Sequence, residues 1–80
     1  MKINKAIREL MVQKKMSLTA MAKALNKERG NDISARLNNG NMSFDKAVEM
    51  LNVLGYEIVI QEKKQGGRRA DQVVIDQTEE

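Results

Sequence analysis

The side chains that could make specific polar contacts gather between residues 17 and 41 of this sequence. Asparagine recurs there, and its amide donates and accepts at adjacent atoms, so it can pair in two places with an adenine edge. The chain has neither cysteine nor histidine. Disulfides, zinc fingers, thiol nucleophiles and histidine acid–base catalysis are therefore excluded. No other nucleophile-and-base arrangement is visible. The residue types predict a binding protein that is not an enzyme and needs no cofactor or metal.

Charge is distributed unevenly along the chain. The formal charge of the 80 residues is +3, yet residues 1–40 carry a net +6 and residues 41–80 a net −3. A basic half joined to an acidic half is typical of a chain with one end facing a polyanion. Ordinary charge scatter over solvated helix faces gives the same totals, so charge alone leaves both interpretations open.

Hydrophobic periodicity predicts four short helices within residues 1–55. Ser17 and Ser43 are expected N-caps, and Gly55 is expected to end the last helix. The apolar stripes that are expected to face the core repeat at helical spacing, and they are Ile3, Ile7, Leu10 and Met11, then Leu18, Met21, Ala22 and Leu25, then Ile33 and Leu37, and finally Phe44, Ala47, Val48, Met50, Leu51 and Leu54.

The period changes after Gly55. Residues 56–61 and 72–76 are rich in β-branched side chains and predict two strands, joined by a polar loop that contains a glycine pair. Two strands alone are marginal in water, so we expect a second copy of the chain to supply partners. Residues 56–76 are thus a predicted dimerisation element, followed by an acidic tail at 77–80. The predicted dimerisation residues are Tyr56, Ile58, Ile60, Val73, Val74 and Ile75.

Three segments together resemble the phage-repressor (XRE, Cro-like) family. Residues 17–25, with the sequence SLTAMAKAL, resemble its second helix, in which a Ser/Thr cap precedes a Leu-Ala-x-x-Leu core. Residues 33–40 resemble the end of its recognition helix, and residues 43–60 resemble the next helix with the strand that some small members append. The resemblance implies a mainly α, lambda-repressor-like helix-turn-helix bundle of four short helices, with a C-terminal β-element shared across a dimer.

The sequence departs from the family pattern in two places. The connection from Leu25 to Ile33 is about one residue longer than usual and contains Gly30, which leaves the start of the third helix open. Leu18 stands where many members have glutamine, a residue that supports the base-reading side chains. Specificity is then left to the third helix alone.

The third helix carries the candidate base-reading residues. A duplex major groove is about 12 Å wide and admits one α-helix. With Ile33 and Leu37 inward, a rotation of about 100° per residue directs the polar side chains outward. The candidates are Asn31, Asp32, Ser34, Ala35 and Asn38. Ala35 could touch a thymine methyl, and Asp32 could accept from a cytosine amine or cap the helix.

Basic side chains and the free amides at a helix start suit phosphate contacts. The candidates are Ser17, Lys23, Lys27, Arg29, Arg36 and Asn39. Two alternatives stay open for this set. The arginines could instead reach guanine, and the asparagines at positions 38, 39 and 41 could simply stop the helix.

These observations predict sequence-specific binding of double-stranded DNA by a homodimer, a small prokaryotic or phage transcriptional regulator that represses by covering its operator. Two half-sites would lie about one helical turn, about 34–36 Å, apart. The alternative is the antitoxin of a toxin–antitoxin pair, whose residues 62–71, acidic tail or strand edge at residues 73–75 would bind a toxin protein. No apolar run reaches membrane-spanning length and no signal-peptide core is present, so a cytoplasmic location is expected.

Overall fold

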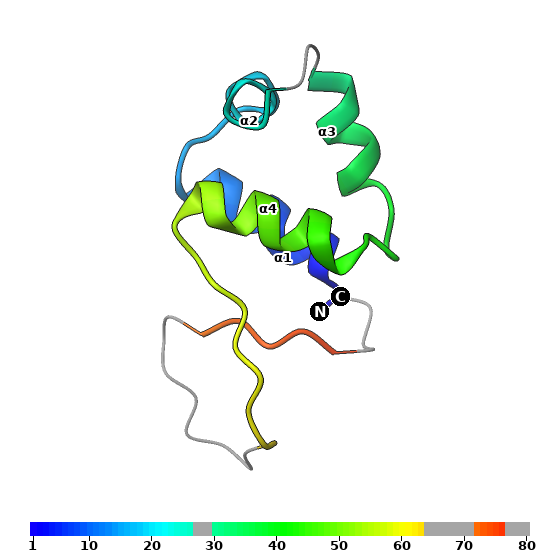
Figure 1. The fold of residues 1–80 in the computed structure, drawn as a ribbon, viewed down its shortest axis with the longest axis vertical. Coiled ribbons are helices and arrows are strands. Elements are labelled where there is room, and N and C mark those ends of the chain that lie inside the picture. Colours follow the sequence, from blue (N-terminus) through cyan, green and yellow to red (C-terminus); the bar gives the residue numbers. More distant parts are fainter. Residues whose placement is uncertain (27–29, 64–71, 77–80) are drawn as a thin grey trace.

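The computed structural model describes residues 1–26, 30–63 and 72–76. Within these ranges the chain forms four helices: α1 (Ile3–Gln13), α2 (Leu18–Ala24), α3 (Gly30–Leu37) and α4 (Phe44–Leu54). Helix α4 packs across α1, and α2 packs on α3 (Figure 1). Helix α3 also contacts α1, and α2 also contacts α4. The predicted mainly helical architecture is confirmed.

One core lies between the four helices, and every helix contributes to it. The most deeply buried large side chains are Ile7 from α1, Met21 from α2, Ile33 and Leu37 from α3, and Met50 from α4. No polar or charged residue is buried among the described residues. The fold therefore depends on apolar packing, which is the dominant favourable contribution in a domain of this size.

Serine caps begin two of the helices, as predicted. The Ser17 hydroxyl accepts a hydrogen bond from the Ala20 amide at 3.0 Å, and the Ser43 hydroxyl accepts one from the Lys46 amide at 3.3 Å. Helix α3 begins at Gly30, so this glycine belongs to the first turn of the helix and not to the connection before it.

Two helices end in the same hydrogen-bonded motif, built around a residue in the left-handed conformation. At the end of α4, Gly55 has a φ of 85° and the Tyr56 amide donates to the Leu51 carbonyl at 2.9 Å. At the end of α1, Lys15 has a φ of 56° and the Met16 amide donates to the Met11 carbonyl at 2.9 Å. This is the Schellman arrangement, in which glycine is the usual residue.

The β-hairpin predicted after Gly55 is not shown by the described residues. Residues 56–63 and 72–76 contain no strand, and residues 64–71 lie outside the described ranges. The second segment contacts the start of the chain, where the Asp76 amide donates to the Met1 carbonyl at 3.1 Å and the amino group pairs with the Asp76 carboxylate at 2.6 Å. A two-stranded hairpin has little stability alone, which gives a physical reason why the described segments 56–63 and 72–76 contain no strand.

Part of the predicted core is wrong. Phe44 is 64% exposed, Val48 is 38% exposed and Leu18 is 39% exposed. The buried stripe of α4 is centred on its other apolar residues, Ala47, Met50, Leu51 and Leu54. Since each residue turns the helix by about 100°, Phe44 and Val48 fall on the edge of that stripe and face solvent.

The left-handed residues that end α1 and α4, Lys15 and Gly55, predict opposite effects on stability. Lys15→Gly should raise the free energy of unfolding by about 0.5–1 kcal/mol, because an L-residue in this conformation costs about 1–2 kcal/mol and the added chain entropy cancels part of the gain. Gly55→Ala should lower it by a similar amount, although nothing lies within 4 Å of the position that its Cβ would take. Urea unfolding measures both. Changes of the same sign would contradict the assignment.

Candidate nucleic-acid interface

The outer face of α3 presents short side chains to solvent. Because Ile33 and Leu37 are buried, the helix turns Asp32, Ala35 and Asn38 outward, and all three are exposed. Ser34, also predicted to read bases, is half-buried. The outward orientation expected for these candidates is therefore seen for three of the four whose side chains are described.

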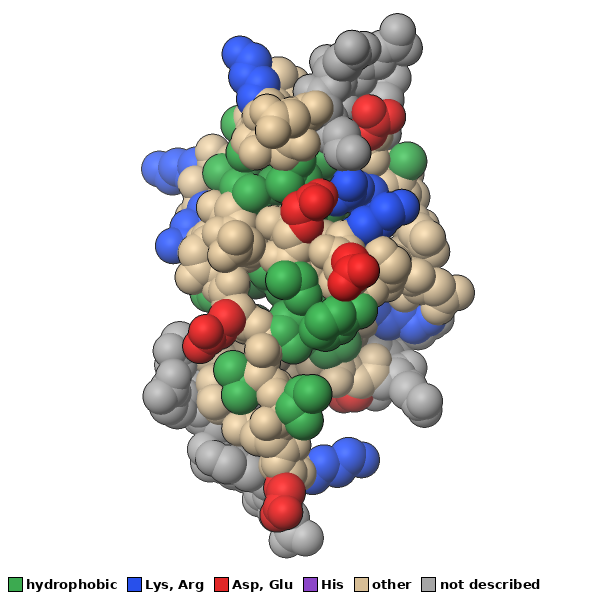
Figure 2. All heavy atoms as spheres, viewed as in Figure 1, with side chains coloured by type: hydrophobic (Ala, Val, Ile, Leu, Met, Phe, Trp, Pro, Cys, Tyr) green, Lys and Arg blue, Asp and Glu red, His purple; other side chains and the backbone are tan. Residues whose placement is uncertain are grey.

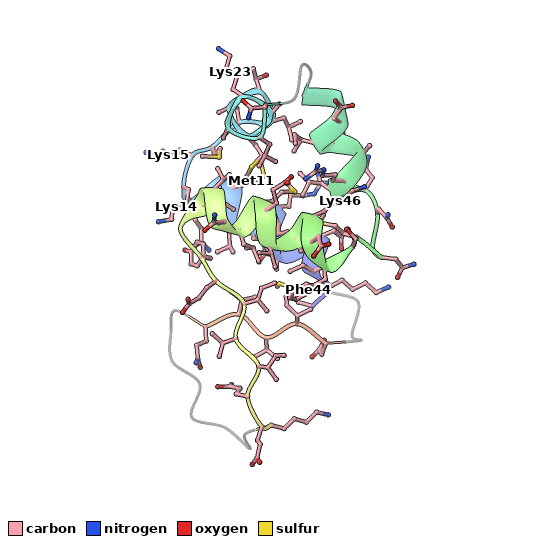
Figure 3. The ribbon with its side chains drawn as sticks, viewed as in Figure 1. Met11, Lys14, Lys15, Lys23, Phe44 and Lys46 are labelled. Carbon is pink, nitrogen blue, oxygen red and sulfur yellow. The ribbon has the colours of Figure 1, made fainter. Side chains whose placement is uncertain are left out.

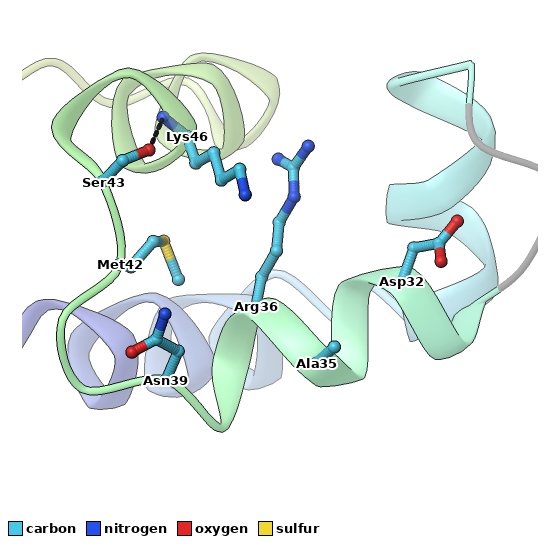
Figure 4. A pocket seen from close by; sticks show the side chains of 7 residues that line it. All are labelled: Asp32, Ala35, Arg36, Asn39, Met42, Ser43 and Lys46. Atoms are coloured by element: carbon cyan, nitrogen blue, oxygen red, sulfur yellow. Dashed lines mark hydrogen bonds between the residues drawn. The ribbon is translucent and has the colours of Figure 1, made fainter.

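A hollow of about 410 Å³ separates this face of α3 from the first turn of α4 (Figure 4). Its walls come from both helices and from the turn between them, and its lining residues are Asp32, Ala35, Arg36, Asn39, Met42, Ser43 and Lys46. The amino-terminal end of α4 borders it, and a helix start carries a partial positive charge. The hollow thus combines outward residues of α3 with an end of α4 that favours anions.

Two cations flank the hollow, and they differ in what they bind. The Arg36 side chain is only 10% exposed, and its Nη1 lies 2.8 Å from Glu49 Oε1 of α4. Lys46 is exposed, and its ammonium forms no ion pair with any described residue. Figure 4 shows both side chains reaching over the hollow, Arg36 from α3 and Lys46 from α4. Arg36 thus holds α3 against α4, whereas Lys46 is available to an anion.

Lys46 was missed by reasoning from the sequence. It lies ten positions beyond Arg36, in the half of the chain with a net negative charge, and it follows the turn after α3. Only the fold, which places the first turn of α4 across the hollow from α3, brings Lys46 there. Its place in the first turn of α4, three residues after the predicted cap Ser43, was the one available signal.

The carboxyl end of α3 is held by α1. The Leu37 carbonyl accepts a hydrogen bond from Asn4 Nδ2 at 3.0 Å and another from Arg8 Nη2 at 3.2 Å. The same Arg8 nitrogen donates to Asn38 Oδ1 at 3.0 Å. Carbonyls at a helix end lack partners within the helix, so these donors satisfy a group that would otherwise need water. The Asn38 oxygen is thereby engaged, which leaves its amide hydrogens to face solvent.

Asn39 shapes the turn that follows α3. Its Oδ1 accepts from the Asn41 amide at 2.9 Å, and its carbonyl accepts from the Met42 amide at 3.2 Å. An asparagine side chain that bonds to the backbone two residues on is a common way to form a turn. Asn39 thus makes the structural contact that the sequence left open, and it also lines the hollow.

The other predicted phosphate contacts are dispersed. The Ser17 hydroxyl is already bound to the Ala20 amide. Lys23 is exposed at the last turn of α2, and Figure 3 shows it at the top of the view, apart from Lys46. Lys27, Arg29 and the side chain of Asn31 lie outside the described residues. The structure therefore brings Arg36 and Asn39, but not Ser17 or Lys23, to the hollow.

The predicted dimerisation residues are largely uncovered. Ile58, Ile60, Val73, Val74 and Ile75 are all exposed large apolar side chains. Tyr56 is half-buried, and the Lys14 ammonium lies 5.4 Å from the centre of its ring.

No family model matches the chain, and no curated protein and no solved structure is significantly similar to it. Among the described residues, no group of three carboxylate, thiol or imidazole side chains is arranged to hold a metal ion. The helices in those ranges are also too short or too polar to cross a membrane. The function must therefore be argued from the side chains of α3 and its surroundings.

The contact between α1 and α3 predicts a stability effect at Arg8. Arg8→Ala removes the guanidinium that bonds to Leu37 and Asn38, and it should lower the free energy of unfolding by about 1–2 kcal/mol. Hydrogen exchange at the Asn38 amide, which donates to the Ser34 carbonyl, should accelerate. Lys5→Ala removes an exposed cation from the same helix and should change stability by less than about 0.5 kcal/mol. Equal stability of the two variants would contradict this role for Arg8.

Proposed function

We propose that the protein binds double-stranded DNA by inserting the outer face of α3 into the major groove, and that it acts as a homodimeric repressor of transcription. One observation carries the proposal. A short helix that is fixed on both sides by α1 and α4 presents small and polar side chains beside Lys46, which forms no ion pair with any described residue.

The shape of α3 supports this docking. The side chains on its exposed face are short, so its backbone can approach the base edges closely. Ala35 would contact a thymine methyl, the Asn38 amide would donate to an acceptor, and Asp32 would accept from a cytosine amine. The hydrogen bonds and the ion pair that fix α3 limit its movement, and a pre-positioned reading surface loses less free energy on binding.

The charges around the hollow support a phosphate contact next to α3. Lys46 and the amino-terminal end of α4 would meet the sugar–phosphate backbone, since backbone contacts set the register of a protein on DNA. Lys23 would meet a second stretch of backbone from α2. Arg36 is paired with Glu49, so we assign it to holding α3 in place.

The exposed β-branched residues after α4 support assembly. In a dimer, residues 56–60 and 73–75 of two copies would pair as strands and cover the side chains that one copy leaves exposed. Two copies of α3 would then read two half-sites, and blocking such an operator needs no further domain.

Salt should weaken binding steeply. If each dimer neutralises about 6–10 phosphates, affinity for duplex DNA should fall by about 10³–10⁵ between about 50 and 200 mM salt. Fluorescence anisotropy with labelled duplexes measures this slope. Binding that does not respond to salt, or no duplex binding at low salt, would contradict the proposal.

Two substitutions separate base reading from phosphate contact. Asn38→Ala should cost about 1–3 kcal/mol on a duplex selected from a random pool and leave a scrambled duplex nearly unaffected. Lys46→Ala should weaken both duplexes alike and reduce the salt slope by about one unit. Lys63→Ala, which removes an exposed cation far along the chain from α3, is the charge-matched control. Equal losses on both duplexes for Asn38→Ala would show that Asn38 only positions the protein.

A further inference from the structure

Helix α4 has a second exposed flank, which the DNA-binding proposal leaves unused. Phe44 and Val48 stand one turn apart on it, and the half-buried Tyr56 and the exposed Ile58 continue the surface beyond the helix end. These four residues, here called the α4 patch, border an apolar hollow of about 320 Å³ whose remaining lining residues are Leu51, Asn52 and Glu57. Figure 2 shows apolar side chains gathered on this face of the molecule.

The four-helix core does not need the α4 patch. Ala47, Met50, Leu51 and Leu54 already fill the space between α4 and the other helices. Phe44 nevertheless places a large aromatic ring in solvent, at 64% exposure. A contiguous apolar patch on a small soluble domain usually marks a contact surface.

The α4 patch lies on the side of α4 away from α3. Figure 3 shows Phe44 and Lys46 on opposite sides of the helix, and Lys46 lines the hollow against α3. A partner that covers the patch therefore leaves the outer face of α3 free.

The charges at the two ends of the α4 patch favour a second copy of this chain as its partner. Asp45 lies in the first turn of α4, beside Phe44, and Lys14 lies over the Tyr56 ring at the other end. A two-fold axis near Val48 would make two copies of α4 antiparallel, so that Asp45 of each copy meets the partner's Lys14. Glu57 would then lie near the positive start of the partner's α4. Opposite charges at opposite ends of one patch make the surface complementary to itself.

We propose that the α4 patch is an isologous contact between two copies of this chain. The inference rests on the homodimer of the proposed function and adds to it a helical interface. The helical contact and the strand pairing lie on one continuous surface, because Tyr56 and Ile58 belong to both.

A substitution in the patch tests this against a matched control. Val48→Glu places a charge at the proposed axis, and Val12→Glu makes the same change at a side chain that is 74% exposed on α1. Sedimentation velocity at tens of micromolar, about the range of a weak dimer, should find the wild type and Val12→Glu dimeric and Val48→Glu monomeric. Circular dichroism checks that both variants remain helical. Equal dimerisation of the two variants would overturn the inference.

Charge reversal gives a second test that does not depend on burial. Asp45→Lys and Lys14→Asp should each weaken the dimer by about three- to tenfold, and the double variant should recover most of the loss. A double variant as weak as the two single losses combined would overturn the inference.

Duplex binding at low salt keeps the two proposals separate. A Val48→Glu monomer that still binds duplex weakly supports both proposals. A wild-type monomer that binds duplex overturns the α4 contact and the homodimer of the proposed function, and it leaves DNA binding by α3 standing. If Val48→Glu abolishes dimerisation and the wild type binds no duplex, the α4 contact is supported and the DNA-binding proposal is contradicted.

Discussion

The burial of Ile33 and Leu37 is the constraint on which the rest of the structure depends. Helix α3 has eight residues, and isolated helices of that length are unstable in water. Its conformation is therefore maintained by packing, and truncating either buried side chain would cost about 2–5 kcal/mol. These two inward residues also fix which side chains of α3 point outward, so the core and the exposed face of α3 are set by the same contacts.

Polar contacts on both sides of α3 fix the orientation of this helix on the core. The Asn4 and Arg8 side chains hold the Leu37 carbonyl from α1, and the Arg36–Glu49 pair joins α3 to α4. The ion pair lies at the edge of the core, where one partner is nearly buried and the other is half exposed. Pairs of this kind contribute modestly to stability, but they restrict how a helix can rotate. Helix α3 is thereby held as a rigid surface.

Helix α4 divides its surface into three sides. One side fills the core, the side with Lys46 and Glu49 borders α3, and the side with Phe44 and Val48 faces solvent. The proposed DNA contact and the proposed dimer contact therefore share one rigid helix. A dimer formed through α4 would set the spacing of the two α3 helices directly, without a flexible linker.

The sequence predicted the features that depend on local chemistry. Ser17 and Ser43 cap helices because a serine hydroxyl accepts from free amides in a first turn, and the inward stripe of α3 follows from its periodicity alone. Lys15 could not be predicted as a helix-ending residue, because it takes a left-handed conformation at a position where glycine is usual.

The features that the sequence did not predict depend on how the helices are placed relative to one another. Arg8 lies outside the apolar stripe predicted for the first helix, yet its long side chain reaches the end of α3. Phe44 and Val48 match a helical core stripe, but the other helices leave them uncovered. The ion pair between Arg36 and Glu49 was not predicted, because only the placement of α4 brings the two side chains together. Strand pairing after Gly55 was predicted from composition, and composition does not supply a pairing partner.

The placement of α3 in a major groove is tested most directly by backbone amide chemical shifts of the ¹⁵N-labelled protein during titration with a selected duplex. We expect the largest changes at Asp32, Ala35 and Asn38, with further changes at Lys46 and little change at Val12. Changes that avoid α3, or that centre on Phe44 and Val48 alone, would contradict it.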